Sequence, residues 1–293
     1  MHGLIIYNGF WNKDAPPQAV QALVDAAAKQ NMMLTPVPNT SLYAHLTDAA
    51  AVVGERAPFA LFWDKDVRLA RAMEAAGMRL YNTAAAVAVC DDKAATQLAL
   101  CGYGIPMVDT WVAPMTYVQY DEAGEAFLCA AETALGYPLV VKECFGSLGG
   151  QVYLAHDAVE LRTLTATMAA RPFVLQRFVA ASSGTDKRLY VVGGKVVAAM
   201  IRQNDGDFRA NVGAGGSGLP YTPTPEEEAL ALRCCEILGC GIAGVDLLTD
   251  ADGSPLVCEV NSSAQTKELC AVTGIDVNAA IIAYVKEQES TIV

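Results

Sequence analysis

Short apolar runs alternate with helical patterns over roughly the first 88 residues of the chain. Strands are expected at Leu4–Tyr7, Leu34–Val37, Phe59–Trp63 and Met78–Tyr81, and helices at Pro17–Lys29 and Val67–Ala76. This rhythm predicts a small parallel sheet with helices on both faces. Asn8-Gly9 follows the first strand, where α/β sheets usually bind ligands, but we interpret the pair as a plain turn.

The pattern continues as mixed α/β structure through the rest of the chain. From Val108 to Gln176 it reads strand, helix, strand, glycine loop, strand, helix, strand. A hairpin is expected at Thr185–Val192 and Lys195–Gln203, with Gly193-Gly194 as its turn. Further helices are expected at Asp91–Cys101, Asp157–Ala170, Pro225–Leu238 and Val277–Glu287.

The segment Ile242–Asn261 reads as two apolar strands joined by a tight turn at Asp250–Gly253. Strand alternation predicts Val257, Glu259 and Asn261 on one face, and Leu256, Cys258 and Val260 on the other. Asp246 interrupts the first strand, where a carboxylate is costly unless it is paired or bound to a cation. Two carboxylates and an amide oxygen on neighbouring strands suit Mg²⁺. The hairpin alone equally allows these acids to lie on a solvated face.

Two lysines are candidates for phosphate binding. Lys142 ends an apolar strand directly before the glycine loop Glu143–Gly150, and such loops let backbone N–H groups close on phosphate oxygens. A lysine buried there favours an anionic ligand. Lys93 stands at a helix start, where its charge opposes the macrodipole. That position favours a functional lysine, although ordinary capping by Asp91 and Asp92 also accounts for the segment.

Composition and charge limit the classes of binding partner that are expected for this chain. The chain has 293 residues and a net charge of −12, which argues against a general affinity for nucleic acid. No apolar run approaches the ~18 residues needed to cross a bilayer, and the first residues do not resemble a signal peptide, so no membrane partner and a cytoplasmic location are expected. With nine cysteines, three histidines and no C-x-x-C motif, reduced core cysteines are expected rather than a zinc site.

Nine short motifs occur in an order that resembles the ATP-grasp carboxylate–amine ligases, specifically the RimK-like (alpha-L-glutamate ligase) family, over roughly residues 80 to 285. They are Asp92-Lys93, Val140–Lys142, Gly146–Gly149, Gln176–Phe178, Gly184–Gly193, Phe208–Asn211, Ala243–Asp246, Glu259–Asn261 and Thr273–Asp276. Each motif is weak by itself, and the specificity comes from their order.

The resemblance implies a role for each matching position. Lys93, Lys142 and the loop residues Gly146, Ser147 and Gly149 would hold ATP phosphates, and Gln176, Arg177, Phe178 and Val179 would line the adenine pocket. Asp186 would contact the nucleotide, and Arg209 with Asn211 would lie near the γ-phosphate. Asp246, Glu259 and Asn261 would bind two Mg²⁺ ions, with Mn²⁺ as an alternative. Lys142 and Arg209 would be the catalytic groups.

The expected fold is α/β of the ATP-grasp type. A small N-terminal parallel α/β domain (1–88) would precede two α+β subdomains (89–175 and 176–293) that clasp ATP. The resemblance implies ligation of a small-molecule or peptide carboxylate to an amine through an acyl phosphate, with release of ADP and phosphate. The alternative is a nucleotide-binding protein that has lost turnover and acts as a sensor or partner. Whether the chain forms a homo-oligomer is left open by the sequence.

Two departures from the family pattern bear on the substrate and nucleotide sites. Arg177 stands where the family usually has an acid, next to the expected adenine pocket. After Asn211 the family tends to carry a basic pair, whereas this chain has Gly213-Ala214. Bidentate arginine pairs are strong recognisers of carboxylates. We therefore expect a substrate with fewer carboxylates than glutamate.

Overall fold

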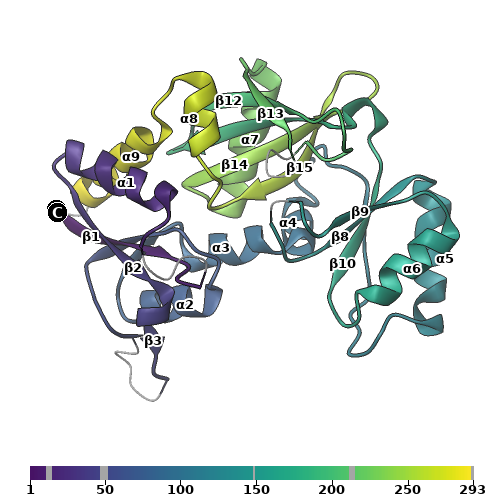
Figure 1. Cartoon of the computed structure of the whole chain (residues 1–293), viewed down its shortest axis with the longest axis horizontal. Helices are drawn as coiled ribbons and strands as arrows, with labels where there is room; N and C mark the ends of the chain where they lie inside the picture. The colour runs from purple at the N-terminus through teal and green to yellow at the C-terminus, as the bar shows by residue number, and fades with distance from the viewer. Residues whose placement is uncertain (11–14, 47–51, 148, 211–214, 292–293) are drawn as a thin grey trace.

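Three sheets organise the chain, whose computed structural model describes residues 1–10, 15–46, 52–147, 149–210 and 215–291 (Figure 1). The sheets follow one another in sequence, with strand orders β2-β1-β5-β6, β7-β10-β8-β9 and β13-β12-β11-β14-β15. A short ribbon, β3 (Tyr43–Ala44) and β4 (Val52–Val53), adds a fourth. The division of the chain at residues 88 and 175 stays a prediction.

The N-terminal sheet is parallel, as its sequence pattern predicts. It contains β1 (His2–Tyr7), β2 (Met33–Pro38), β5 (Phe59–Phe62) and β6 (Arg79–Tyr81). Alternation along β1 sends Ile5 toward helix α1 (Gln18–Lys29) on one face and Leu4 and Ile6 toward α2 (Val67–Ala75) on the other. The prediction of helices on both faces is therefore confirmed.

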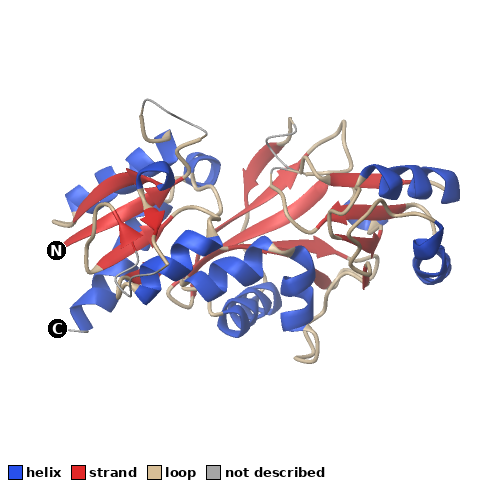
Figure 2. Cartoon of the chain, turned by 90° about the horizontal axis from the view of Figure 1, so that it is seen from below, coloured by secondary structure: helices blue, strands red, loops and turns tan. Residues whose placement is uncertain are grey.

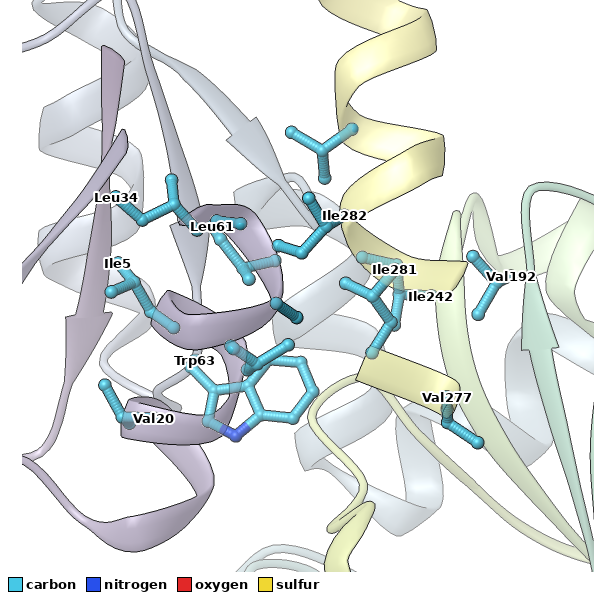
Figure 3. Packing of buried hydrophobic residues seen from close by; sticks show 14 of the residues in the cluster. Ile5, Val20, Leu34, Leu61, Trp63, Val192, Ile242, Val277, Ile281 and Ile282 are labelled. Atoms are coloured by element: carbon cyan, nitrogen blue, oxygen red, sulfur yellow. The ribbon is translucent and has the colours of Figure 1, made fainter. Parts of the chain in front are cut away.

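The C-terminal helix α9 (Val277–Thr291) packs against the N-terminal sheet, beside α1 (Figure 1). Its Ile281 and Ile282 lie between Leu61 of the N-terminal sheet and Ile242 of the C-terminal sheet, within one apolar cluster (Figure 3). The two termini consequently lie at the same end of the molecule (Figure 2). The short helix α8 (Lys267–Thr273), which the sequence pattern does not predict, precedes α9.

The helix predicted at Asp91–Cys101 is present as α4 (Lys93–Leu100). The alanine-rich segment before it forms a further helix that the sequence pattern does not predict, α3 (Ala84–Asp91), and a break at Asp92 separates the two. Asp92 is extended, and its carboxylate accepts the backbone N–H groups of Ala94 and Ala95, so that it caps α4.

The central sheet is antiparallel and carries helices on one face. Its strands are β7 (Thr110–Val112), β8 (Leu139–Glu143), β9 (Val152–Ala155) and β10 (Phe173–Arg177). Helices α5 (Glu125–Leu135) and α6 (Ala158–Thr167) cover it, and Leu128 and Leu161 pack against Val141 and Leu175.

The C-terminal sheet is also antiparallel. Its strands are β11 (Thr185–Val192), β12 (Lys195–Gln203), β13 (Ser217–Pro220), β14 (Ile242–Thr249) and β15 (Pro255–Asn261). Helix α7 (Pro225–Leu238) covers one face; Thr224 and Glu227 form a capping box at its start, and Gly239 ends it in the left-handed conformation. Both predicted hairpins are confirmed.

A β-bulge on β15 overturns the predicted side-chain alternation there. Asp246 pairs with Glu259 but its neighbour Leu247 pairs with Val257, so Cys258 is the extra residue. Val257 is consequently buried in the core under α7 and does not share a face with Glu259, whereas Cys258 lines the same cavity as Glu259.

The structure also shows where the cysteines lie and whether any helix could span a membrane. Seven of the nine cysteines are buried or half-buried free thiols, but Cys101 and Cys129 are exposed, so the prediction of core cysteines is wrong for those two. In the part of the chain that the structure describes, no single helix is long and apolar enough to cross a membrane. Helices α8 and α9 reach that length and apolarity only when taken together, and a 115° bend separates them.

One buried amide ties the N-terminal sheet to the C-terminal sheet. The Nδ2 group of Asn82, directly after β6, donates to the carbonyl oxygens of Ile242 (2.6 Å) and Ser262 (2.8 Å). Its Oδ1 accepts the backbone N–H groups of Gly241 (2.9 Å) and Ile242 (3.0 Å). All the bonds that a side-chain amide can readily make are thus satisfied across one interface.

Replacing Asn82 by aspartate is expected to destabilise the protein. The substitution keeps the shape but turns a carboxylate oxygen toward two carbonyl oxygens, so the free energy of unfolding should fall by about 2–4 kcal/mol. Urea unfolding measures the change. The matched control is Asn31→Asp, at an exposed position in the left-handed region that aspartate also tolerates, and it should leave stability unchanged. Equal stability of both variants would contradict the assigned role of Asn82.

Candidate active site

A cleft of ≈ 940 Å³ lies where the three sheets meet. Every predicted site residue that the structure describes lines it, whereas Asn211 lies outside the described residues. These lining residues are Lys93, Lys142, Gly146, Ser147, Gly149, Gln176, Arg177, Phe178, Val179, Asp186, Arg209, Asp246, Glu259 and Asn261. The structure therefore brings together positions that are up to 168 residues apart in the sequence, from Lys93 to Asn261. Their individual roles stay predictions.

A buried charge cluster forms the floor of the cleft. Asp246 is only 3% exposed, and its two oxygens accept hydrogen bonds from Arg188 Nε and Nη2, each at 2.7 Å. Arg202 donates to Asp246 at 2.9 Å and to both oxygens of Asp186 at 2.6 and 2.5 Å. Strand register sets these pairs, because Arg188 lies opposite Asp246 and Arg202 lies opposite Asp186.

The two guanidinium groups keep Asp246 ionised. Burial alone would raise the pKa of this carboxyl, but Arg188 and Arg202 outweigh burial and hold its pKa below the ordinary value. Removing either arginine would leave a buried charge without full compensation. The free-energy cost of such a charge is much larger than the stabilisation that an exposed ion pair provides.

Glu259 and Asn261 fit a divalent metal ion. Glu259 lies beside Asp246 across β14 and β15, and Asn261 follows two residues later at the end of β15. Neither side chain makes a hydrogen bond or ion pair with any other described residue, so their oxygens face the cleft without a protein partner. Oxygen donors of this kind suit Mg²⁺. Asp246 differs, because its lone pairs are already shared with two arginines.

Two lysine ammonium groups face the cleft on the opposite wall. Lys142 lies in β8 with its Nζ 3.5 Å from Cys258 Sγ, and Lys93 begins α4 with its backbone N–H bound to the Cys144 carbonyl at 3.0 Å. Neither ammonium has a carboxylate partner among the described residues. Lysines in such positions are suited to bind an anionic group.

The glycine loop beside Lys142 allows a ligand to approach the backbone of the loop closely. Gly146 has φ 146° and Gly149 has φ 75°, both in the region that favours glycine, and a Cβ at Gly146 would lie 2.3 Å from Gln151 Oε1. Arg209 reaches the loop from the C-terminal part of the chain and donates to the Gly149 carbonyl at 2.7 Å. Its other nitrogens bind Asp207, so its charge is compensated here.

The residues predicted to surround adenine form a slot between the central and C-terminal sheets. Buried Val179 packs with Val108 and Leu256, and the Phe178 ring lies 6.3 Å from that of Phe208. Gln176 donates to Thr110 at 2.8 Å. An apolar slot with a few polar groups is the usual form of a site for a flat ring.

Arg177 does not place an uncompensated charge in that slot. Its guanidinium makes a bidentate ion pair with Asp250, at 3.2 and 2.7 Å, in the turn between β14 and β15. Since the charge of Arg177 is neutralised within the protein, the departure from the family pattern at this position leaves the slot free for a base.

Sequence reasoning missed the wall that the N-terminal sheet supplies. Asn8, Trp63, Asp64 and Lys65 line the cleft from the ends of β1 and β5, and Asn8 donates to Asp64 at 3.3 Å. The predicted turn at Asn8-Gly9 is present, with the Phe10 N–H donating to Asn8 Oδ1 at 3.1 Å, and Asn8 lines the cleft as well. Polar residues directly after apolar parallel strands were the available signal, because the carboxyl ends of such strands meet at one edge.

Comparisons with known proteins agree with this geometry. A family model of the RimK-like ATP-grasp domain matches residues 90–285. The probable alpha-L-glutamate ligase of Legionella pneumophila (strain Corby) is 36% identical over 227 residues, 76% of this chain and 72% of that protein. The N-acetylaspartylglutamate synthase A of Homo sapiens is 34% identical over 223 residues, 75% of this chain but only 56% of that protein.

Among solved structures, the RimK domain protein ATP-grasp from Sphaerobacter thermophilus DSM 20745 has a similar fold. The TM-score is 0.74 over 98% of this chain and 100% of that chain, at 23% sequence identity. The ATP-grasp fold expected from the motifs is thereby confirmed.

Arg202→Lys tests the charge cluster. A lysine ammonium cannot donate in parallel to Asp186 and still reach Asp246, so the free energy of unfolding is expected to fall by about 3 kcal/mol. The matched control is Arg233→Lys, in an exposed pair with Glu236 on α7, which should leave stability unchanged. Denaturant unfolding of both variants gives the comparison. If Arg202→Lys proved as stable as the control, the cluster would not be what holds β11, β12 and β14 together.

Proposed function

Because the chain belongs to the RimK-like ATP-grasp family, it is an ATP-dependent C–N ligase, and we propose that it joins a carboxylate to an amine through an acyl-phosphate intermediate. The proposal rests on which charged side chains of the cleft form ion pairs within the protein and which do not. Its arginines are compensated by protein carboxylates, while Lys93, Lys142 and Glu259 have no ion-pair partner among the described residues and are available for ligands.

ATP would lie between the central and C-terminal sheets. Its base would occupy the slot near Gln176 and Val179, and its phosphates would meet the glycine loop, Lys93 and Lys142. Family members bind ATP or ADP with magnesium. Here Glu259 and Asn261 would hold the metal, with Asp246 behind them, and two Mg²⁺ ions or Mn²⁺ are compatible with these oxygen donors. Such a metal neutralises charge on the phosphates.

The reaction would proceed in two steps. A substrate carboxylate oxygen attacks the γ-phosphorus of ATP, the bond to the β-phosphate oxygen breaks, and ADP leaves. The amine nitrogen then attacks the carbonyl carbon of the acyl phosphate, phosphate leaves, and the nitrogen loses a proton to give the amide. Lys142 would stabilise the charge of the transferred phosphoryl group, while the cleft fixes the two substrates in position. No side-chain nucleophile is required.

Arg209 would act on the loop over the phosphates. In this structure it binds both Asp207 and the Gly149 carbonyl, so it links the central and C-terminal sides of the cleft. We propose that it closes the loop over bound ATP and there approaches the γ-phosphate.

ADP release distinguishes this proposal from nucleotide binding without turnover. The assay measures ADP formation from ATP–Mg²⁺ across a panel of amino acids, peptides and small carboxylates, offered singly and in pairs. A ligase requires both an acid and an amine for sustained turnover. Binding of ATP with no stimulation by any pair would favour the sensor role, and turnover with no amine requirement would indicate a kinase or ATPase.

Glu259→Gln is the test of the metal site. The substitution preserves size but removes the charge that would bind the metal, so the rate of ADP release is expected to fall by about a hundredfold or more while the fold survives. Circular dichroism checks the fold. Glu287→Gln, at an exposed position on α9, is the matched control and should retain full activity. Wild-type turnover by folded Glu259→Gln would exclude Glu259 as a metal ligand.

The substrate is expected to carry fewer carboxylates than glutamate. Arg188, Arg202 and Arg209 are the arginines near the predicted acceptor side, and all three are paired with Asp246, Asp186 or Asp207. The rate of ligation with neutral amino acids should therefore exceed that with glutamate by about tenfold at saturating ATP. A strong preference for glutamate would contradict this, and would mean that one of these arginines leaves its carboxylate when substrate binds.

A further inference from the structure

The N-terminal wall of the cleft holds two buried polar atoms that lack a partner. Trp63 and Asp64 directly follow β5, and both side chains line the cleft. Neither the indole Nε1–H of Trp63 nor Oδ2 of Asp64 has a hydrogen-bond partner among the described residues. Since buried polar groups are normally hydrogen-bonded, an unmatched donor and an unmatched acceptor on consecutive residues indicate a place for a ligand.

Asp64 is a buried carboxylate that has no cationic partner among the described residues. The residue is 7% exposed, and its Oδ1 accepts only neutral donors, the Lys65 backbone N–H at 2.7 Å and Asn8 Nδ2 at 3.3 Å. The adjacent Lys65 ammonium does not compensate it, because that group pairs with Asp91 at 2.7 Å. Burial raises the pKa of the Asp64 carboxyl, and the two neutral donors only partly offset this.

Among the described residues, the charged groups that act most on the Asp64 carboxyl are themselves carboxylates, Asp66 and Asp91, which raise its pKa further. A carboxylate buried in this way costs free energy unless an opposite charge arrives. A cationic substrate group would supply that charge.

This wall lies where it can hold a substrate group close to the reacting atoms. Lys65, the next residue after Asp64, extends its ammonium to 3.5 Å from the Gly146 carbonyl in the glycine loop. On the other side, Trp63 belongs to the apolar cluster that contains Ile242 (Figure 3). The same cluster contains Ala264, which follows Asn261 at the end of β15 by three residues. The wall thus connects the proposed phosphate site with the strand end of the proposed metal site.

We propose that Asp64 binds the ammonium group of one of the two substrates, and that the Trp63 indole N–H binds a carbonyl or carboxylate oxygen of the same molecule. This rests on the proposed function, because it assigns a substrate to the N-terminal side of the cleft. The substrate class is a free amino acid, in which an ammonium group stands close to a carboxylate oxygen. A charge-assisted hydrogen bond to a buried carboxylate gives both affinity and orientation.

Direct binding tests the assignment without turnover. The protein is saturated with a non-hydrolysable ATP analogue and Mg²⁺, and calorimetry measures the binding of each standard L-amino acid and of its N-acetylated counterpart. At least one amino acid should bind about tenfold more tightly than its acetylated form. Asp64→Asn, which keeps the shape, should abolish that preference and leave the affinity for the ATP analogue unchanged.

The matched control is Asp66→Asn, two residues further along the same loop. Asp66 caps α2 through the Leu69 N–H and does not line the cleft, and asparagine caps helices as well as aspartate does. This variant should keep the wild-type preference. Trp63→Phe removes only the N–H and should weaken binding of the amino acid by several-fold while the preference for the free ammonium group remains.

Three results would overturn the proposal. They are equal binding of free and acetylated forms by the wild-type protein, no binding of any amino acid, and retention of the preference by folded Asp64→Asn. The wild-type comparison stands even where a variant does not fold. Failure of the proposed ligase activity has a different signature, since ammonium-dependent binding would then be present but no amino acid would stimulate ADP release.

Discussion

A carboxylate buried in the middle of a sheet sets the constraint on which the cleft depends. Asp246 is tolerated in β14 only because Arg188 and Arg202 approach it from β11 and β12, and the second arginine in turn requires Asp186. Two acids and two arginines leave the floor nearly neutral. Among the described residues of the cleft, Lys93, Lys142, Glu259 and Asp64 have no ion-pair partner, and these are the groups that we propose bind ligands.

That floor forms part of a cleft only because parts distant in the sequence pack against it. Asn82 joins the end of the N-terminal sheet to β14, and α9 returns from the end of the chain to cover the N-terminal sheet beside α1. Lys65 and Arg209 reach the glycine loop of the central sheet from opposite sides. The same contacts that stabilise the fold therefore determine which side chains surround the reactants.

Local sequence patterns predict the elements well where the signal is itself local. The hairpins follow from their Gly-Gly and Asp-Gly turns, and Lys142, Asp246 and Glu259 follow from charges placed within or at the end of apolar strands. The bulge at Cys258 depends on pairing with β14, which no single strand encodes. Likewise the arginine pairs depend on cross-strand register, the break at Asp92 interrupts a continuous helical pattern, and Asp64 joins the site only through packing of separate sheets.

The central claim is that ATP activates a carboxylate in this cleft, and oxygen-18 transfer tests it most directly. A carboxylate substrate that supports ADP release is labelled with oxygen-18 in its carboxyl group, and the released phosphate is analysed by mass spectrometry. Attack of the carboxylate on ATP followed by displacement of phosphate predicts one labelled oxygen in each phosphate formed. Unlabelled phosphate, with amide still produced, would contradict the acyl-phosphate route.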